Sequence, residues 1–269
     1  MSKVVMITSA VLAGVIVLAL VAGISFMKMK GWSRTSVLLA LKMEADQIKD
    51  DQHVLPYRLY QPDTDTQQSL PLILVLHGAG ERGTDNIRQL NYTIKQLVSS
   101  EFQSIQPAFI LAPQSPPGQE WTDNQVIALP AVNYDIRSSK PNWKQHLLIQ
   151  LIHQLTVEYP IDTTRIYLTG FSMGATGSWE MLYHYPQIFS AAAILSGRSD
   201  PAIAETLKDI PIAIFHGKED KTAPLENSLA MYQALKPINP LVTLNVLEAG
   251  HNISGLSYTT DLYRWLVNH

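Results

Sequence analysis

The sequence predicts an α/β protein whose doubly wound, mostly parallel sheet is flanked by helices. Short apolar runs recur along the chain and are separated by segments of helical length, which is the pattern of such a sheet. The run Leu70–Leu76 is almost continuously apolar, as expected of a parallel strand that is covered on both faces. With 269 residues, of which 46% are hydrophobic, the chain can bury one substantial core. The predicted strands are residues 53–61, 71–76, 107–112, 165–169, 190–195, 211–216 and 241–247.

The N-terminal segment, residues 1–30, differs in character from the rest of the chain. No charged residue occurs between Val4 and Met27, and this apolar run is long enough to cross a bilayer of about 30 Å as a helix. We therefore predict an N-terminal, single-pass transmembrane helix that anchors the protein in a membrane. The alternative is a signal peptide, because Lys3 supplies a minimal basic region, and its cleavage would leave a secreted or periplasmic protein. More basic residues follow the run than precede it, which favours a cytoplasmic domain but leaves the side of the membrane open.

Residues 31–52 have a polar to amphipathic sequence and are expected to connect this anchor to one folded domain over residues 53–269. The longest insertion in that domain, residues 113–142, is expected to be a lid or pocket wall, or else a solvated surface excursion. Helices are predicted at residues 144–157, 175–185 and 258–267.

The most informative motif is Gly170-Phe-Ser-Met-Gly174, which follows a predicted strand and precedes a predicted helix. This is the context of a nucleophile elbow, in which a serine is held on a tight strand-to-helix turn. The turn strains the backbone at Ser172, and side chains at Gly170 and Gly174 would collide with the neighbouring strand and helix. The motif predicts that Ser172 is a nucleophile and that the protein is a hydrolase.

The two partners that such a serine needs are predicted downstream. A serine hydroxyl is a weak nucleophile, so it requires an imidazole base, which in turn requires a carboxylate to fix its tautomer. Asp220 and His251 each follow a predicted strand, in the chain order serine, acid, histidine. Glu219 competes with Asp220 for the role of the acid. We therefore predict a catalytic triad of Ser172, Asp220 and His251.

An oxyanion hole needs backbone N–H groups that point at the developing negative charge. One donor is expected from Met173, directly after the nucleophile, and the other from Ala79 or Gly80 in the loop after Leu70–Leu76. The loop is rich in glycine, which allows its backbone to approach a ligand closely. His77 begins this loop and is expected to brace it by hydrogen bonds rather than to act as a base.

Three further residues are candidates for the substrate pocket: Trp121, Glu81 and Arg82. Trp121 lies in the long insertion, and its amphipathic ring could bind the apolar part of a substrate while it reaches a hydrogen-bond partner. Glu81 and Arg82 follow the predicted oxyanion donors and could contact substrate. The preferred interpretation is that these two side chains form a buried or half-buried ion pair that fixes the loop.

Taken together, five motifs resemble the α/β-hydrolase superfamily: His77–Asp85, Ala112–Gln114, Gly170–Gly174, His216–Asp220 and Gly250–His251. More narrowly, the chain is similar to the serine esterases often called predicted peptidases, which are close to dienelactone-hydrolase-like and feruloyl-esterase-like proteins. The resemblance covers residues 53–269 and implies an α/β-hydrolase fold. It implies no separate cap domain, because residues 196–210, where many relatives carry one, are too few to form it.

The resemblance also implies the chemistry. In this family the acid stands just ahead of a loop proline, as Asp220 stands ahead of Pro224, which favours Asp220 over Glu219. The expected reaction is hydrolysis of a carboxylic ester through an acyl-enzyme on Ser172. Dienelactone hydrolases proper use a cysteine nucleophile, and this chain contains no cysteine, so their lactone chemistry is not expected. The alternatives are a peptidase or acyltransferase with the same triad, and a membrane-tethered binding protein with a vestigial site.

Composition narrows the range of partners. The formal net charge is −3 and there is no long basic run, so nucleic acid is not an expected partner. The lack of cysteine excludes disulfides and thiolate metal sites. His146 and His153 lie seven residues apart on a predicted helix and are expected to be ordinary helix side chains rather than metal ligands. We therefore expect a small-molecule ester substrate, no cofactor and no metal ion.

Overall fold

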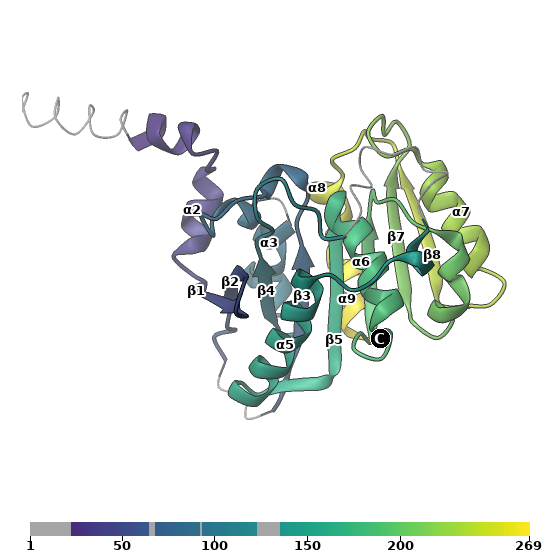
Figure 1. The fold of residues 1–269 in the computed structure, drawn as a ribbon, viewed down its shortest axis with the longest axis horizontal. Helices are drawn as coiled ribbons and strands as arrows, with labels where there is room; N and C mark the ends of the chain where they lie inside the picture. Colours follow the sequence, from purple (N-terminus) through teal and green to yellow (C-terminus); the bar gives the residue numbers. More distant parts are fainter. Residues whose placement is uncertain (1–22, 65–67, 92, 123–134) are drawn as a thin grey trace, which may run out of the picture.

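The computed structural model describes residues 23–64, 68–91, 93–122 and 135–269, which form an eight-stranded sheet in the order β1-β2-β4-β3-β5-β6-β7-β8 (Figure 1). Strand β2 pairs antiparallel with β1 and with β4, and all the other neighbouring strands are parallel. The predicted, mostly parallel sheet is therefore confirmed. The strands are β1 (Glu44–Lys49), β2 (Val54–Tyr60), β3 (Leu70–Leu76), β4 (Phe109–Pro113), β5 (Ile161–Phe171), β6 (Ala191–Leu195), β7 (Ile212–Gly217) and β8 (Val242–Leu247).

Helices cover both faces of the sheet. All seven residues of β3 are buried, as predicted for a strand covered on two sides. Leu72 and Leu74 face a core that includes side chains of α5, α6, α7 and the 3₁₀ helix η6. Ile73 and Val75 face a second core with α3, α4 and α9. These helices are α3 (Thr93–Leu97), α4 (Ser100–Gln103), α5 (Trp143–Glu158), α6 (Met173–His184), η6 (Pro201–Leu207), α7 (Glu226–Leu235) and α9 (Thr260–Val267).

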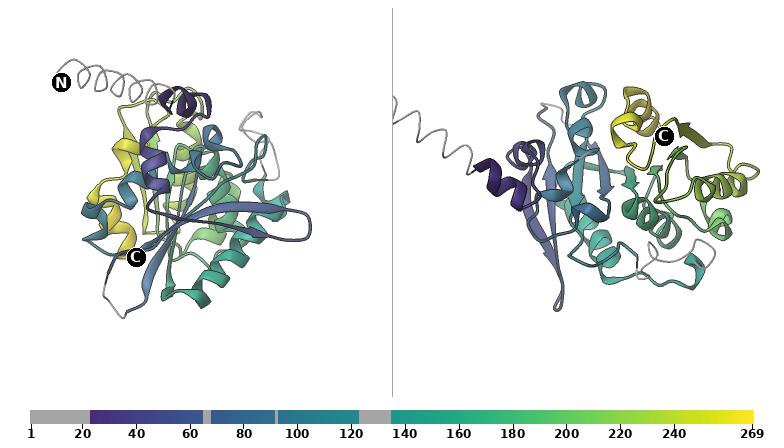
Figure 2. Two further views of the ribbon diagram at one scale, coloured as in Figure 1. Left: turned by 90° about the vertical axis from the view of Figure 1, so that its left-hand side faces the viewer. Right: turned by 90° about the horizontal axis from the view of Figure 1, so that it is seen from above.

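The sheet begins earlier in the chain than the sequence predicts. Within residues 31–52, where we expect a connector, the structure has helix α2 (Arg34–Ala40) and strand β1. The hairpin of β1 and β2 lies at the edge of the sheet (Figure 2). Ile48 is the one buried residue of β1, and it pairs with Leu55 of β2. Because an edge strand that is mostly exposed carries no apolar alternation, its sequence does not indicate a strand.

The predicted transmembrane helix over residues 1–30 falls mostly outside the described residues, which begin at residue 23. In the part of the chain that the structure describes, no helix is long and apolar enough to cross a membrane. The segment that follows is tied to the domain, since Ser33 Oγ donates to Asn91 Oδ1 at 2.6 Å. The membrane anchor therefore stays a prediction.

The long insertion, residues 113–142, is described at its two ends, and residues 123–134 lie outside the described part of the chain. Trp121 at one end and Ile136 at the other are buried. The backbone N–H of Ile136 donates to Asp200 Oδ2 at 3.1 Å, just before η6. Both ends therefore pack against the domain, and the lid stays a prediction.

Candidate active site

The predicted site residues follow the carboxyl ends of parallel strands, so they meet at one edge of the sheet. Ser172 follows β5, Asp220 follows β7 and His251 follows β8, while Ala79 follows β3, the neighbour of β5. Three strands separate β8 from β3, so the loops after β8 must reach back over the sheet. After His251 the chain continues through α8 (Ser254–Ser257) to α9, which packs against β5 and β6.

The turn that carries Ser172 is strained and leaves no room for side chains beside it. Ser172 has a φ of +55°, a left-handed conformation that is rare for a residue with a side chain. A Cβ added to Gly170 would lie 2.4 Å from the Gly174 carbonyl oxygen, and one added to Gly174 would lie 1.9 Å from the Leu76 carbonyl oxygen. Only glycine fits at these two positions, as predicted. The Ser172 N–H donates to the Leu195 carbonyl at 2.9 Å, which ties the turn to β6.

A continuous chain of hydrogen bonds joins the three predicted triad residues. His251 Nε2 lies 2.8 Å from Ser172 Oγ, and His251 Nδ1 lies 2.7 Å from Asp220 Oδ2. Because a carboxylate only accepts, Nδ1 carries the proton and Nε2 is free to accept the serine hydroxyl. The second oxygen of Asp220 accepts the backbone N–H groups of Thr222 and Ala223, at 2.8 and 2.9 Å. The fully buried carboxylate is thus held in one orientation.

A histidine to which the sequence analysis gave no role lies behind the acid. His216 is fully buried, and its Nε2 donates to the Ala223 carbonyl at 2.7 Å and lies 3.3 Å from Asp220 Oδ2. Its Nδ1 therefore accepts the hydroxyl of Ser228, at 2.7 Å. The signal for this residue was present, since His216 and Asp220 are the two ends of one motif. The competing acid, Glu219, is exposed and is not the carboxylate on His251.

His77 braces the start of the oxyanion loop, as predicted. Its Nε2 accepts the N–H of Ser115 at 2.9 Å, so its Nδ1 carries the proton and donates to the Gly78 carbonyl at 2.6 Å. Burial lowers the pKa of His77 to about 4. The ring is therefore neutral at pH 7, which is the form that these two hydrogen bonds require.

The backbone groups predicted for the oxyanion hole come from two neighbouring segments. Met173 is the first residue of α6, and the first N–H groups of a helix have no acceptor within that helix. Ala79 and Gly80 lie in the 3₁₀ helix η1 (Ala79–Glu81), directly after β3. Arg82 joins the two segments, because its Nε lies 3.2 Å from Met173 Sδ.

The ion pair expected between Glu81 and Arg82 is wrong, because Arg82 pairs with Glu120 instead. Arg82 Nε also donates to the Gln119 carbonyl at 2.8 Å. Glu81 is buried, and this burial raises its pKa against the effect of nearby backbone hydrogen bonds. Glu81 is the last residue of η1, and Arg82 leaves the helix with a ψ of 143°, so the two neighbours in the sequence face different surroundings. Arg82 therefore binds the start of the long insertion and the elbow, and Glu81 lies inside the domain.

Trp121, predicted as a wall of the substrate pocket, is a core residue with 1% of its surface exposed. Its indole N–H donates to the His77 carbonyl at 3.0 Å, and its ring lies edge-on to the His77 imidazole at 5.1 Å. A Cβ added to Gly177 of α6 would lie 2.3 Å from the Cβ of Trp121. The polar end of this ring thus binds the backbone beneath the oxyanion loop, and the residue supports the loop rather than facing a ligand.

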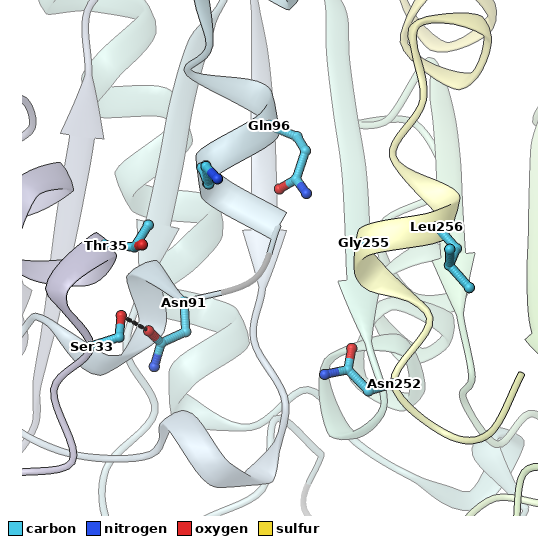
Figure 3. Close-up of a pocket in the computed structure, with 8 residues that line it drawn as sticks. Ser33, Thr35, Asn91, Gln96, Asn252, Gly255 and Leu256 are labelled. Atoms are coloured by element: carbon cyan, nitrogen blue, oxygen red, sulfur yellow. Dashed lines mark hydrogen bonds between the residues drawn. The ribbon is translucent and has the colours of Figure 1, made fainter. Parts of the chain in front are cut away.

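The structure has one hollow at the serine and another that is lined by none of the three predicted triad residues. A small recess includes Ser172, and a groove of about 660 Å³ is lined by Asn252, the residue after His251 (Figure 3). The recess is also lined by Met173, Thr176, Ser196, Arg198, Thr222 and Ala223. The groove has mostly amide and hydroxyl side chains, and its lining residues are Ser33, Thr35, Asn91, Lys95, Gln96, Asn252, Gly255 and Leu256.

No metal centre accompanies these groups within the ranges that the structure covers. There, no three histidine, aspartate or glutamate side chains lie close enough together to hold a metal ion. His146 and His153 are exposed on α5.

The sheet order and the position of the elbow define an α/β-hydrolase, and solved structures agree. The chain is similar to a thermostable esterase, with a TM-score of 0.75 and 32% identity over 86% of this chain and 64% of that chain. An esterase from Pyrococcus furiosus has a TM-score of 0.63 and 17% identity, over 87% of this chain and 95% of its own. A ferulic acid esterase has a TM-score of 0.61 and 13% identity, over 84% and 98%. The last two share the fold alone.

The sequence profile of the phospholipase/carboxylesterase family matches residues 62–259, and the chain belongs to this family. The resemblance to α/β-hydrolase esterases is therefore confirmed. A curated relative, the bifunctional acetylxylan esterase/xylanase of Neocallimastix patriciarum, is 29% identical over 152 residues. That match covers 56% of this chain and 19% of the relative, so the chain spans about a fifth of the relative's length.

Proposed function

We propose that the protein is a serine esterase that hydrolyses carboxylic esters through an acyl-enzyme on Ser172. The observation that carries this proposal is the hydrogen-bond chain from Ser172 through His251 to Asp220, with distances of 2.8 and 2.7 Å. Membership of a carboxylesterase family supports the reaction class, and so do the relatives that are named as esterases. A nucleophile, a base and an orienting acid in one hydrogen-bonded line are what acyl transfer to a serine requires.

In the first half-reaction His251 Nε2 takes the hydroxyl proton as Ser172 Oγ attacks the ester carbonyl carbon. The carboxylate of Asp220 stabilises the imidazolium that forms. The N–H groups of Met173 and of Ala79 stabilise the negative charge on the carbonyl oxygen, with Gly80 as the alternative second donor. His251 then gives its proton to the leaving alkoxide, the C–O bond breaks, and the alcohol departs.

In the second half-reaction water replaces the alcohol. His251 Nε2 takes a proton from the water molecule as its oxygen attacks the acyl carbon, and the bond to Ser172 Oγ then breaks. The serine recovers its proton from His251, and the carboxylic acid leaves. His251 returns each proton that it takes up, so the two half-reactions balance with the ester and water as the only reactants.

The groove indicates which part of the ester lies on each side of the nucleophile. His251 protonates the alcohol, so the alcohol must leave on the side of His251, and we assign it to the groove because the next residue, Asn252, lines that groove. Five of the eight residues that line the groove carry an amide or a hydroxyl group, which supports an alcohol with hydrogen-bonding groups. The curated relative named as an acetylxylan esterase agrees with an ester of a polar alcohol.

The same proposal includes a membrane location for the enzyme. The uncharged run from Val4 to Met27 supports an anchor. Ile24, Phe26 and Met29, at the described end of this segment, are 51%, 47% and 75% exposed, so the apolar surface there is not covered by the domain. A cleaved signal peptide is the alternative.

Turnover of simple esters tests the proposed reaction. We expect the purified protein to hydrolyse phenyl acetate and the Ser172→Ala variant to lose nearly all of this activity, with an unchanged thermal unfolding midpoint. A parallel panel of peptide amides should be cleaved far more slowly than the esters. Equal ester turnover by the variant would contradict the assignment of Ser172, and faster cleavage of the amides would make the enzyme a peptidase.

A further inference from the structure

Ser196, directly after β6, has a strained backbone conformation. Its φ is +51°, and in the described part of the chain only two other non-glycine residues, Asn86 and Ser172, have positive values. Residues with side chains are rarely held in this region, and such strain gathers at functional sites. One of the other two strained residues is the proposed nucleophile.

The hydroxyl of Ser196 is also left without a partner. The residue is fully buried, and Oγ makes no hydrogen bond to any residue that the structure describes. A buried hydroxyl without a partner is unfavourable, because it loses its bonds to water and gains none in return. Strain and an unpaired polar atom therefore occur together at a single residue, and each calls for an explanation.

The surroundings fix the backbone that carries this hydroxyl and pack it against α6, the helix that begins after the nucleophile. The Ser196 N–H donates to the Phe215 carbonyl at 2.9 Å. A Cβ added to the next residue, Gly197, would lie 2.5 Å from the Cβ of Ala175, so the chain is pressed against α6. Ser196 and Ser172 line the same recess. The residue with the unpaired hydroxyl thus has a fixed backbone and belongs to the wall of the recess that Ser172 also lines.

The position of the recess identifies the part of the substrate that enters it. The oxyanion is expected on the side of η1, after β3, and the alcohol on the side of His251. Neither His251 nor any residue of η1 lines the recess. Of the proposed oxyanion donors only Met173 lines it, and its other walls come from Ser172, Thr176 of α6 and the segments after β6 and β7. Strand β6 lies on the opposite side of β5 from β3. The recess therefore takes the remaining group on the carbonyl carbon, which is the acyl chain.

We propose that Ser196 is a specificity-determining residue whose hydroxyl hydrogen-bonds a polar atom on the carbon next to the ester carbonyl. The recess has room for about one water molecule, which is the size of a hydroxyl or methyl group. The enzyme should therefore prefer short acyl groups, and among these the 2-hydroxyacyl esters. This inference rests on the proposed serine esterase activity.

Two esters of equal size test the role of the hydroxyl. Phenyl glycolate and phenyl propionate differ only in a hydroxyl for a methyl group at the end of the acyl chain. The ratio of their kcat/KM values is compared between the wild type and Ser196→Ala, because the intrinsic reactivity of each ester cancels in this comparison. We expect the ratio of glycolate to propionate to fall about tenfold in the variant, the loss of one hydrogen bond.

Two further variants separate this role from a structural one. Ser196→Gly also removes the hydroxyl but adopts the left-handed backbone without strain, so it should reproduce the fall in the ratio even if the alanine variant folds poorly. Ser190→Ala removes a hydroxyl at the other end of β6, where Oγ donates to the Ile166 carbonyl at 3.1 Å, and should keep the wild-type ratio. If Ser196 had only a structural role, its variants would have a lower unfolding midpoint, and kcat/KM would fall equally for both esters.

The possible failures are distinguishable. An unchanged ratio in both Ser196 variants, with normal turnover of propionate, would overturn this inference and leave the esterase proposal intact. A wild type that reacts with a fluorophosphonate but hydrolyses neither short ester would overturn the predicted acyl size. A wild type that neither hydrolyses these esters nor reacts with the fluorophosphonate would contradict the proposed function, and this inference would fall with it.

Discussion

At the scale of single residues, the site depends on a few side chains that hydrogen bonds hold in one orientation. The buried carboxylate of Asp220 accepts two backbone N–H groups on one oxygen and His251 on the other. Its partner His251 is therefore fixed in the tautomer that leaves Nε2 facing Ser172. Glu219, one residue earlier, is exposed and cannot take this place without a change of the loop.

The two neighbouring acids give a matched pair of variants. Asp220→Asn should lower kcat for phenyl acetate by about 10⁴-fold, because an amide can hold the wrong tautomer of the histidine. Glu219→Gln should leave kcat unchanged. Circular dichroism and thermal unfolding serve as controls for folding. If the Glu219 variant lost its turnover while the Asp220 variant kept it, the acid would have to be reassigned.

The buried histidine of the oxyanion loop makes stability depend on pH. The pKa of His77 is about 4 in the folded protein, below its ordinary value of 6.5, so as the pH falls the unfolded chain takes up the proton first. The contribution of His77 to the free energy of unfolding is complete above pH 6.5 and is lost as the pH falls towards 4. The loss would be about 3 kcal/mol at most.

Urea unfolding between pH 7 and pH 4 measures this dependence. The variant His77→Gln lacks the titrating ring, so its unfolding free energy should fall less steeply over this range than that of the wild type. Carboxylates such as Asp85 and Glu81 titrate in both proteins, so the difference between the two slopes isolates the histidine. Equal slopes would mean that His77 is not the residue responsible.

At the scale of elements, the elbow forms because strand β5 and helix α6 approach β3 closely. A matched pair of glycines tests this packing. Gly174→Ala should abolish folding or lower the unfolding midpoint severely, since the added Cβ would lie 1.9 Å from a backbone oxygen of β3. Gly255→Ala in α8 should leave the midpoint nearly unchanged, because nothing lies within 4 Å of the added atom. A stable Gly174 variant would show that β3 and α6 are less closely packed.

The elements that could be predicted are those whose burial imposes a hydrophobic pattern on the sequence. Strands β3, β4 and β6 are buried along their whole length, so their sequences are apolar throughout. Strand β1 is exposed except at Ile48, and its polar sequence does not distinguish it from a connector. The elbow was predictable because steric exclusion imposes glycines beside Ser172, a requirement that is local in the sequence.

The site residues that escaped prediction depend on contacts between distant segments. The partner of Arg82 is Glu120, on the segment after β4, and an adjacent acid in the sequence was the wrong choice. The amphipathic ring of Trp121 suits a pocket wall or a core equally well from sequence alone. Ser196 belongs to no sequence motif. Its proposed role rests on its unpaired Oγ and on the recess that it shares with Ser172, and both depend on the folded chain.

At the scale of the whole molecule, the segment after the predicted anchor contributes to the groove. Ser33 and Thr35 line one wall, and Asn252 and Leu256 line the other (Figure 3). Beyond the residues outside the described structure, the N-terminal segment from Ser33 through α2 thus packs on the domain and borders the groove.

Two deletions separate these parts. Removal of residues 1–22 should release the enzyme from membranes. Its esterase activity should be unchanged, because all the proposed catalytic residues, from Ala79 to His251, lie later in the chain. Removal of residues 1–43 should also strip α2 and this wall, and should raise KM for esters of polar alcohols. The full chain should resist carbonate extraction. A shortened mature chain in the soluble fraction would instead indicate a cleaved signal peptide.

The central claim is that His251 activates Ser172 for attack on an acyl carbon, and covalent labelling tests it most directly. Incubation with a fluorophosphonate should add one adduct, which mass spectrometry of the digested protein should assign to Ser172. The labelling rate should fall by orders of magnitude in folded His251→Ala, because no base then takes the serine proton. An adduct on another serine, or equally fast labelling of the His251 variant, would contradict the account.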